Sequence, residues 1–468
     1  MTSLRLFLGT QDPSRLKFLL LALLASALLF AGLDRGGLSG YDDALYAQEA
    51  KEMLQSRDWT RVQFGGEINH EHPPMFVWLE AASIALFGAN DFAAKIPSAL
   101  TGIGTILLLY HLVQELTGDS WLGLTSMLVL TTSLLFAKNA THAMPDVPFA
   151  FFVTAAILFY IKGLRNPRYF IPMGLATGCG IMIRSIVGVV PIATMAIHLV
   201  ASRRTCVLWS KRFIVGVLTG LALPAWWFVL RSSPEHLYFL IGKASAPSLE
   251  YGWLLARHYL PWFPILLIGL VIYVRESVRK RIDPLWFLPL IWFGIFIIPL
   301  SFTTPKYGRY LLPTFPALAL MTALTLQRII PRRKMSAAYY TGCVLLLCIT
   351  VGKIVFPAPE RGVDMRTLAP IAERNTAPGE RVLMYTSGEP GFDYRNQFVW
   401  YSARYTRFLL SAQDLYAALR ECSPQVLIID KASYQQLLQC KGAAHVHLLG
   451  ESPRFVCVRV GAARVPLS

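Results

Sequence analysis

The amino-acid sequence predicts an all-α polytopic membrane protein followed by a small extramembrane α/β domain. Three observations support this prediction: 54% of the 468 residues are hydrophobic, only 15% are charged, and the apolar residues gather in long runs. Soluble domains carry about 25% charged residues, and a run of about 20 apolar residues can cross the hydrocarbon core of a membrane. Most of the chain is therefore predicted to lie in lipid.

Eleven segments have the length and composition of a membrane span. They cover residues 16–33, 92–114, 120–137, 147–163, 169–183, 186–201, 213–230, 258–274, 284–301, 309–326 and 336–356. The first is too long and too poorly terminated for a cleaved signal peptide, so we expect the chain to retain it. A transmembrane domain is thus expected over residues 1–357 and an α/β domain over residues 358–468.

The apolar stretch 169–201 is predicted to cross the membrane twice. A single helix of this length would measure about 50 Å, well beyond a hydrocarbon core of about 30 Å. Basic residues flank the stretch at both ends, with Arg168 before it and Arg203 and Arg204 after it. Because cytoplasmic loops are enriched in Lys and Arg, Arg184 is expected at the tip of a hairpin on the far side.

The distribution of basic residues also gives the orientation of the chain. The net charge is +16, and most Lys and Arg residues fall in short clusters between the apolar runs. Such clusters are typical of cytoplasmic loops that face anionic lipid, so the charge does not indicate nucleic-acid binding. Arg15 and Lys17 place the N-terminus in the cytoplasm. Eleven crossings then place the C-terminal domain outside it.

The loop between the first two spans, residues 34–91, is expected to be external. Within it, Asp42–Gln55 has helical spacing and Pro73–Phe87 forms a second amphipathic stretch. Both are predicted to be helices that lie in the outer membrane interface. Together they could form a lid over a site at the ends of the spans.

The composition changes in the C-terminal segment. Arg381–Thr386 and Gln425–Asp430 are predicted to be strands, and Ser411–Arg420 is predicted to be a helix. The seven cysteines of the chain form no CxxC motif. A disulfide is feasible in an oxidising compartment among three cysteines of this segment, whose pairing cannot be deduced from spacing: Cys422, Cys440 and Cys457.

The strongest chemical signal is the acidic segment Gly40-Tyr41-Asp42-Asp43-Ala44-Leu45-Tyr46-Ala47, directly after the first span. A carboxylate held beside lipid, away from bulk water, can act as a general base on an acceptor hydroxyl or amine. Alternatively, Asp42 and Asp43 cap the following helix, because Asp is favoured at helix N-termini. One of the two can cap while its neighbour catalyses.

Two further segments carry ionisable residues on the same expected side. In His70-Glu71-His72-Pro73-Pro74 the imidazoles and the carboxylate could bind a divalent metal, although adjacent residues rarely point at one ion. His72 could instead donate to a phosphate oxygen, and a solvated loop is the simpler alternative. In His142-Ala143-Met144-Pro145-Asp146, the carboxylate of Asp146 is a candidate for catalysis or for a helix cap.

Basic residues on the outer side need an explanation, because Lys and Arg are usually enriched in cytoplasmic loops. Lys306 and Arg309 lie at the outer start of the tenth span, and Arg184 lies at the predicted hairpin tip. Binding of an anion is one reason, and contact with lipid headgroups is the ordinary one. Cations and carboxylates that arrive from separate spans suit a donor with a phosphate leaving group and an acceptor that must lose a proton.

These segments resemble the dolichyl-phosphate-mannose protein mannosyltransferase superfamily, and within it the bacterial aminoarabinose transferases of lipid A. The resemblance covers residues 15–330 and rests on four motifs: Tyr41-Asp42-Asp43-x-x-Tyr46-Ala47, Glu71-His72-Pro73-Pro74, Pro145-Asp146 and Lys306-x-x-Arg309-Tyr310-Leu311-Leu312-Pro313. It implies a GT-C fold in the bacterial inner membrane with a periplasmic C-terminal domain. The implied reaction is inverting transfer of a sugar from a polyprenyl-phosphate donor to a lipid, glycan or protein acceptor.

The resemblance also implies roles for particular residues. It makes Asp42 the catalytic base, Asp43 its acidic neighbour and Asp146 a second active-site aspartate. The remaining implied positions are a donor-phosphate site at His72, Arg184, Lys306, Arg309 and Tyr310, further pocket positions at Tyr46 and His142, and a metal site at Glu71 with His70. A divalent metal is thus allowed but not required, and no nucleotide or redox cofactor is implied, in line with the lack of any Walker or Rossmann glycine motif.

Two departures from the family pattern bear on specificity. His72 stands where the family commonly has lysine, which would make donor binding sensitive to pH. Leu45 stands where the aminoarabinose enzymes have arginine, which leaves the sugar and the acceptor open. A secondary transporter would predict repeats and polar residues near mid-bilayer, and the sequence has no repeat. A non-catalytic assembly or receptor protein, and an oligosaccharide ligase or polymerase, remain as alternatives.

Overall fold

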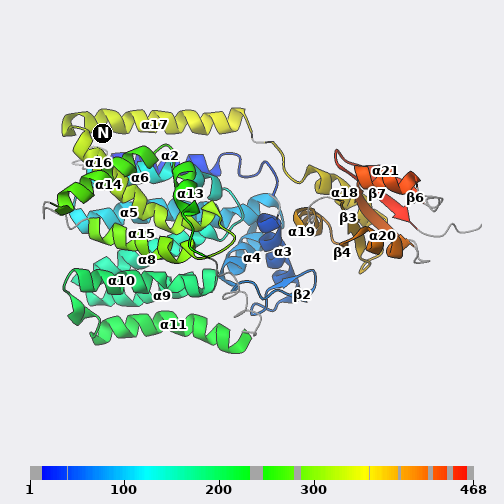
Figure 1. Cartoon of the computed structure of the whole chain (residues 1–468), viewed down its shortest axis with the longest axis horizontal. Helices are drawn as coiled ribbons and strands as arrows, with labels where there is room; N and C mark the ends of the chain where they lie inside the picture. The colour runs from blue at the N-terminus through cyan, green and yellow to red at the C-terminus, as the bar shows by residue number, and fades with distance from the viewer. Residues whose placement is uncertain are drawn as a thin grey trace, which may run out of the picture.

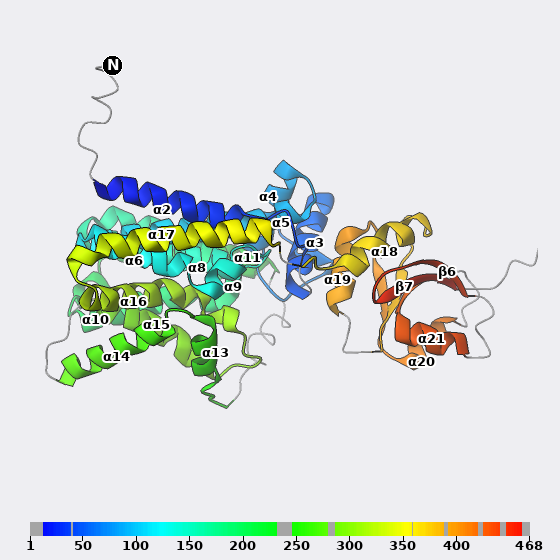
Figure 2. The same cartoon turned by 90° about the horizontal axis from the view of Figure 1, so that it is seen from above.

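The computed structural model describes residues 13–38, 41–231, 246–278, 286–357, 359–387, 392–419, 425–439 and 446–460. Figures 1 and 2 show a bundle of long helices joined through a small helical layer to a mixed α/β domain. The bundle contains α2 (Pro13–Phe30), α5 (Asp91–Thr117), α6 (Ser120–Thr131), α7 (Leu134–Asn139), α8 (Asp146–Arg165), α9 (Phe170–Arg184), α10 (Val190–Ala201), α11 (Lys211–Arg231), α13 (Glu250–His258), α14 (Phe263–Val278), α15 (Phe287–Ser301), α16 (Phe315–Ile329) and α17 (Arg332–Val355).

The helices of the bundle follow the predicted apolar segments. In the described part of the chain, six helical stretches are long and apolar enough to cross a membrane, and α6 and α15 are shorter apolar helices. The segment predicted at 120–137 is divided, because Ser133 has extended backbone angles (φ −70°, ψ 115°) and separates α6 from α7. The fold class is confirmed, whereas the number of eleven crossings stays a prediction.

The apolar stretch 169–201 changes direction where the sequence analysis expects a hairpin tip. Helix α9 ends at Arg184, and the 3₁₀ turn η2 (Ser185–Val189) leads into α10. Ser185 has a positive φ of 49°, and a Cβ atom at Gly188 would lie 2.3 Å from the backbone nitrogen of Ile181. The chain therefore folds back on the end of α9, which leaves the Arg184 side chain at a turn.

Helix α9 packs against α11 through pairs of glycines that the sequence analysis does not single out. A Cβ atom at Gly174 would lie 1.7 Å from the carbonyl oxygen of Gly216, and one at Gly178 would lie 2.3 Å from that of Gly220. Glycines four residues apart on two helices let the backbones approach closely, as in membrane helix pairs of the GxxxG type. This contact fixes α9, and with it Arg184.

The loop between α2 and α5 forms the layer beside the bundle. It contains α3 (Tyr41–Ser56), α4 (Met75–Phe87) and the two-residue strands β1 (Gln63–Phe64) and β2 (Glu67–Ile68), which pair antiparallel. Both helices were predicted, but α3 does not lie on an open surface. It is buried over most of its length because α4 covers one side and a helix of the C-terminal domain covers another (Figure 1).

The C-terminal domain is a five-stranded sheet with helices on both faces. Its strands run in the order β4-β3-β5-β7-β6, with β4, β3 and β5 parallel and β7 antiparallel to both neighbours. Its elements are α18 (Val363–Arg374), β3 (Val382–Tyr385), α19 (Phe392–Tyr401), β4 (Thr406–Leu409), α20 (Ala412–Leu419), β5 (Gln425–Asp430), α21 (Lys431–Gln439), β6 (Val446–Glu451) and β7 (Phe455–Val460). The strand predicted at Gln425–Asp430 agrees with β5. Cys457 is a buried free thiol, whereas Cys422 and Cys440 lie outside the described residues.

The C-terminal domain is held to the bundle through Asp91, the first residue of α5. The Asp91 carboxylate accepts hydrogen bonds from Trp400 Nε1 at 3.0 Å and from the Tyr401 hydroxyl at 3.2 Å, and it forms an ion pair with Arg366. Lys51 of α3 donates to the Trp400 carbonyl oxygen at 3.2 Å. The domain therefore contacts both α5 and α3.

Candidate active site

Four charged side chains from four separate segments meet where α3, α8, α9 and the 3₁₀ turn η5 (Gly308–Thr314) approach each other. Arg309 Nη1 lies 2.7 Å from Asp42 Oδ2, and Arg309 Nε lies 4.0 Å from Asp146 Oδ2. Arg184 forms an ion pair with the other oxygen of Asp146. Carboxylates and guanidiniums thus alternate in the order Asp42, Arg309, Asp146 and Arg184. All of these except Arg184 belong to the family motifs quoted in the sequence analysis.

Asp42 and Asp146 pair with arginines of other segments, although each lies in the first turn of a helix. Asp42 lies in the first turn of α3 and pairs with Arg309. Helix α8 begins after Pro145, without a side-chain cap, and Asp146 points to Arg184. Both carboxylates are therefore used across helices.

Two tyrosines complete the cationic side of this cluster. The guanidinium carbon of Arg309 lies 4.5 Å from the ring centroid of Tyr307, and that of Arg184 lies 5.6 Å from the ring centroid of Tyr310. Cations over aromatic faces gain electrostatic stabilisation. The aromatic rings therefore help to keep both arginines at the junction of the four segments.

A cavity of about 340 Å³ opens beside this cluster. Its lining is mixed: the charged and polar residues are Glu71, His72, Asp146, Arg184, Ser185, Thr303, Thr304 and Tyr310. The apolar lining comprises Pro73, Phe149, Ile183, Ile186, Val187, Phe296, Pro299, Leu300, Pro305 and Pro313. Asp42 and Arg309 are not among the described residues that line it, and they adjoin it through Asp146.

His72 lines the cavity and contacts Glu49, a buried acid of α3. His72 Nε2 lies 2.8 Å from Glu49 Oε2, and Asn69 donates to the other Glu49 oxygen at 2.6 Å. Burial opposes the charged imidazole, but the Glu49 carboxylate outweighs it and raises the pKa of His72. The Tyr46 ring packs 4.6 Å from the imidazole, centroid to centroid.

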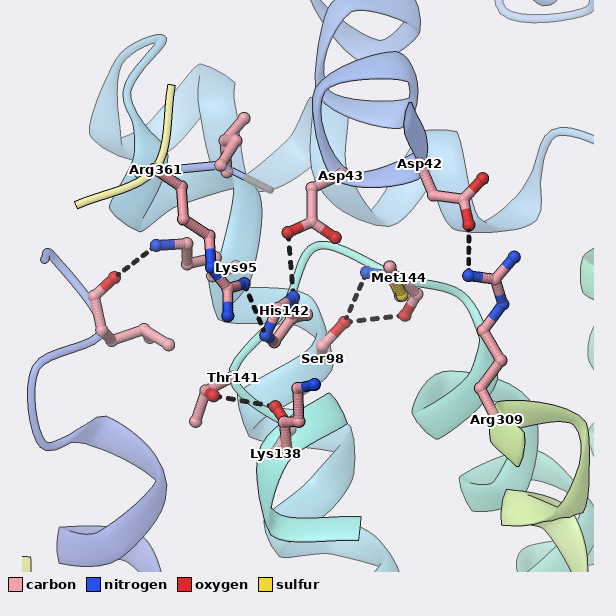
Figure 3. A network of polar contacts seen from close by, with 12 residues as sticks. Asp42, Asp43, Lys95, Ser98, Lys138, Thr141, His142, Met144, Arg309 and Arg361 are labelled. Carbon is pink, nitrogen blue, oxygen red and sulfur yellow. Dashed lines mark hydrogen bonds and ion pairs between the residues drawn. The ribbon is translucent and has the colours of Figure 1, made fainter. Parts of the chain in front are cut away.

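Asp43 points away from its neighbour Asp42, into a different set of contacts (Figure 3). Asp43 Oδ2 lies 3.0 Å from His142 Nδ1, and His142 Nε2 lies 3.2 Å from Arg361 Nη1. The side chain of Asp43 is fully buried. Adjacent residues on the first turn of α3 therefore serve two separate polar networks.

Three further predicted positions differ in their relation to the cavity. Lys306 Nζ donates to the Thr303 carbonyl oxygen at 2.8 Å, and the cavity is lined by Thr303 but not by Lys306. Glu71 lines the cavity, whereas His70 lines a hollow beside Trp227. Within the described ranges, no group of three His, Cys, Asp or Glu side chains is placed to hold a metal ion. Metal binding by Glu71 and His70 stays a prediction.

The electrostatics of the cluster favour a carboxylate that can exchange a proton. Burial raises the pKa of Asp42, the neighbouring Arg309 charge lowers it, and the Asp146 charge raises it, with a net upward shift. A carboxylate whose pKa lies closer to the working pH is a better general base than a fully stabilised anion. The site therefore combines a candidate base with two guanidiniums and an adjoining apolar cavity.

Sequence reasoning missed three residues of these networks: Glu49, Tyr307 and Arg361. Glu49 is fully buried, although its helix was expected to lie in the membrane interface. The signal that could have identified Glu49 is its spacing, because it is an acid seven residues after Asp42 on the same helix. Tyr307 lies within the quoted basic motif. Arg361 lies between α17 and α18, where no periodic pattern identifies it.

Comparison with known proteins agrees with the motifs. A family model described as dolichyl-phosphate-mannose-protein mannosyltransferase matches residues 71–228. An uncharacterised protein of Aquifex aeolicus is 28% identical over 323 residues, which are 66% of this chain and 63% of that protein. The undecaprenyl phosphate-alpha-4-amino-4-deoxy-L-arabinose arabinosyl transferase 2 of Sodalis glossinidius is 28% identical over 309 residues, covering 60% of this chain and 54% of its own length. The chain thus spans little more than half the length of that transferase.

Solved structures show the same fold at low sequence identity. ArnT from Cupriavidus metallidurans bound to undecaprenyl phosphate superposes with a TM-score of 0.76 at 17% identity, over 94% of this chain and 97% of that one. An oligosaccharyltransferase from Archaeoglobus fulgidus gives a TM-score of 0.60 at 13% identity, over 91% and 70% of the two chains. The family match over residues 71–228 and the shared fold agree with the resemblance to the dolichyl-phosphate-mannose protein mannosyltransferases. The chain has the GT-C fold, and α3, which carries Asp42, lies at one end of the long helices (Figure 2).

Proposed function

We propose that the protein is an inverting glycosyltransferase that takes a sugar from a polyprenyl-phosphate donor and transfers it to an acceptor on the non-cytoplasmic side of a bacterial inner membrane. The observation that supports this best is the cavity of about 340 Å³, whose lining combines Arg184 and Tyr310 with many apolar side chains. A lipid phosphate likewise combines an anionic group with a hydrocarbon chain. Donors of this class are also named for the curated relatives and for the ligand-bound structural neighbour.

The two arginines are the proposed binders of the donor phosphate. Arg184 and Arg309 are each held by Asp146, whose side chain is only 3% exposed. Guanidinium groups bind phosphate oxygens through paired, charge-assisted hydrogen bonds. In a partly dehydrated site, two such groups stabilise the charge that develops on the departing phosphate.

Asp42 is the proposed general base. Its carboxylate forms an ion pair with Arg309 at 2.7 Å. A phosphate that engages Arg309 competes with this ion pair, so donor binding releases Asp42 to accept a proton from the acceptor. The acceptor oxygen then attacks the anomeric carbon, the bond from that carbon to the phosphate oxygen breaks, and the lipid phosphate leaves with the negative charge.

The sugar, the acceptor and the orientation belong to the proposal as well. A lipid acceptor in the outer leaflet is the proposed class, with the N-terminus in the cytoplasm and the C-terminal domain in the periplasm. Leu45 is 7% exposed and lies three residues after Asp42 on α3, at the position where the aminoarabinose enzymes have arginine. Because this chain lacks that cation, the proposed sugar need not be aminoarabinose. Because Glu71 and His70 lack a third ligand among the described residues, we derive no step through a metal.

The test is direct transfer by the purified full-length protein in lipid nanodiscs. We expect turnover of a radiolabelled undecaprenyl-phosphate pentose or hexose in the presence of an outer-leaflet lipid extract, with release of undecaprenyl phosphate. Mass spectrometry of envelope lipids from a deletion strain identifies the missing sugar. Intact envelope glycans in that strain, together with no donor consumption by the purified protein, would refute the proposal and favour a transport or assembly role.

A further inference from the structure

A second pocket, of about 230 Å³, lies on the side of α3 to which Asp43 points (Figure 3). It is built from segments far apart in the sequence: the connection between α2 and α3, helix α5, the loop before α8, the end of α17 and the linker into the C-terminal domain. Its lining comprises Ala31, Gly32, Arg35, Gly36, Gly37, Asp43, Lys95, Thr141, His142, Lys353, Phe356, Pro357, Pro359 and Arg361. The mechanism proposed above does not use it.

Four cations line this pocket, and each is held by a neutral partner. Lys95 Nζ donates to the carbonyl oxygens of Leu33 and Arg35, at 3.3 and 3.0 Å. Lys353 Nζ donates to the Leu28 carbonyl oxygen at 3.0 Å. Arg35 donates to the carbonyl oxygen of Ile354 at 3.3 Å, while Arg361 meets the imidazole of His142 as described above.

The positive charge of the pocket is not balanced by carboxylates. Asp43 is the one acid in the lining. Asp91 acts on Lys95 electrostatically, but it is already engaged by Arg366. Of the residues whose placement is described, no Asp or Glu forms an ion pair with any of the four cations. Lys95 is only 4% exposed, and an unbalanced charge at such depth is costly.

The backbone around the pocket is closely packed. Gly36 and Gly37 have positive φ angles of 78° and 65°, and the Gly36 carbonyl oxygen accepts a hydrogen bond from the Arg361 backbone nitrogen at 3.0 Å. A Cβ atom at Gly37 would lie 2.2 Å from the Arg361 carbonyl oxygen. The linker is therefore fixed against the connection between α2 and α3, and Arg361 is delivered to a defined place.

We infer that this pocket is a second anion site, separate from the donor cavity, which binds a phosphate group through Arg361, Lys353, Lys95 and Arg35. Cations from four segments surround a tetrahedral oxyanion better than a planar carboxylate, because each phosphate oxygen can face a different donor. The ends of α2 and α17 form part of the wall, so a phosphate carried by a lipid headgroup can reach the pocket as well as free phosphate. Lys353 and Arg361 lie outside the residues that the family model matches.

The second anion site is connected to α3 through a chain of side-chain contacts. Arg361 contacts His142, and His142 contacts Asp43, which neighbours Asp42 on the same helical turn. An anion that engages Arg361 competes with the contact between Arg361 and His142, and so changes the surroundings of the His142–Asp43 pair. Occupancy of the second site is thereby linked to the helix that carries the proposed base.

Binding can be tested without any transfer reaction, so the outcome is independent of the proposed function. The probes are inorganic phosphate, measured by isothermal titration calorimetry on the full-length protein in neutral detergent, and phosphatidic acid compared with phosphatidylcholine, measured by native mass spectrometry. The test variant is Lys353→Gln/Arg361→Gln. The matched control is Arg333→Gln/Lys334→Gln, which removes two exposed charges from the first turn of α17, the helix that also carries Lys353.

We expect the test variant to bind the anion at least tenfold more weakly, because each cation contributes a charge-assisted hydrogen bond, and the control to bind like the wild type. Loss of inorganic phosphate binding indicates a free anion, and selective loss of phosphatidic acid indicates a lipid headgroup. Equal binding by both variants, or no anion binding by the wild type, overturns the inference. Thermal melting identifies a misfolded variant, in which case the single substitution Lys353→Gln is used instead.

Discussion

Arg309 binds Asp42 at 2.7 Å and lies 4.0 Å from Asp146, so one guanidinium is shared between two carboxylates that come from different helices. Asp146 is buried and also pairs with Arg184, whereas the Asp42 side chain is 17% exposed. The Arg309 contact with Asp42 is therefore the one that a ligand can exchange. Such an arrangement keeps the candidate base neutralised until an anion takes its partner.

Replacement of Asp42 tests this role directly. We expect Asp42→Asn to lower the transfer rate by about 10² to 10⁴-fold, the contribution typical of general base catalysis, with normal membrane insertion and melting temperature. Initial rates with saturating donor measure the effect. Glu67→Gln is the matched control, because Glu67 is an exposed acid of the same loop. A transfer rate of Asp42→Asn equal to that of the control would remove Asp42 from the mechanism.

The pH profile of transfer gives a second test. Because burial raises the pKa of Asp42 while Arg309 lowers it, the rate is expected to fall as the pH drops through a pKa above the usual value of 3.8. The base is active when deprotonated, so activity is retained above that pKa. In Arg309→Gln the lowering influence is lost, and the acid limb should move to higher pH. Rates at saturating donor separate this shift from weaker donor binding, and an unmoved acid limb would argue against the assignment.

His72 should make donor binding depend on pH in the opposite sense. Although burial opposes its charge, Glu49 raises the pKa of His72, so the imidazolium persists to a higher pH than usual. Donor affinity is expected to fall as the pH rises through that pKa. His72→Lys, which restores the residue common in the family, should abolish this fall, and His72→Gln should give weak binding at every pH. The KM for donor between pH 5 and 9 is the measurement.

How far the sequence predicts this structure depends on how local the signal is. Helix α3 and strand β5 were found because a period of 3.6 or a short apolar run is visible within one segment. Strands β4 and β6 were missed, because Thr406–Leu409 is four residues long and the exposed residues of Val446–Glu451 show no alternation. The burial of α3 could not be predicted for a similar reason, since α3 packs against α19, which lies far along the chain.

The residues of the candidate site also divide into those that a local sequence signal marks and those that only tertiary contacts bring to the site. Asp42, Asp146, Arg184 and Arg309 could be anticipated, because charges at the ends of apolar segments are unusual and family motifs mark them. Arg361 could not be, since nothing in the sequence tells that the linker packs on Gly36 and Gly37. Contacts that depend on a domain returning to the bundle appear only with the tertiary structure.

Glu80 offers a test of stability. It is fully buried on α4, and neither of its carboxyl oxygens has a hydrogen-bond partner among the described residues. Burial and the nearby Glu49 and Asp43 charges raise the pKa of Glu80 well above its usual value. A group with a raised folded-state pKa stabilises the fold at low pH and loses that contribution as the pH rises through this pKa, by up to about 1.4 kcal/mol per pH unit. Glu80→Gln should flatten the fall of the melting temperature that begins as the pH rises above the ordinary pKa of 4.5, and an unchanged fall would show that Glu80 is not its source.

Asp91 should determine whether the C-terminal domain stays on α3. In Asp91→Ala, Arg366, Trp400 and Tyr401 all lose a shared acceptor, and a buried donor left unpaired costs about 1 to 3 kcal/mol. Hydrogen exchange is expected to increase in α19 and in the first turns of α3, while the inner strands of the sheet keep their protection. Asp91→Asn retains an acceptor oxygen and should show a smaller effect. We also expect Asp91→Ala to lower the kcat of transfer and to leave the KM for the donor unchanged. The reason is that α3 carries the proposed base, whereas Arg184, a proposed binder of the donor phosphate, lies on α9. Unchanged exchange in α3 would mean that the domain does not support the helix that carries Asp42.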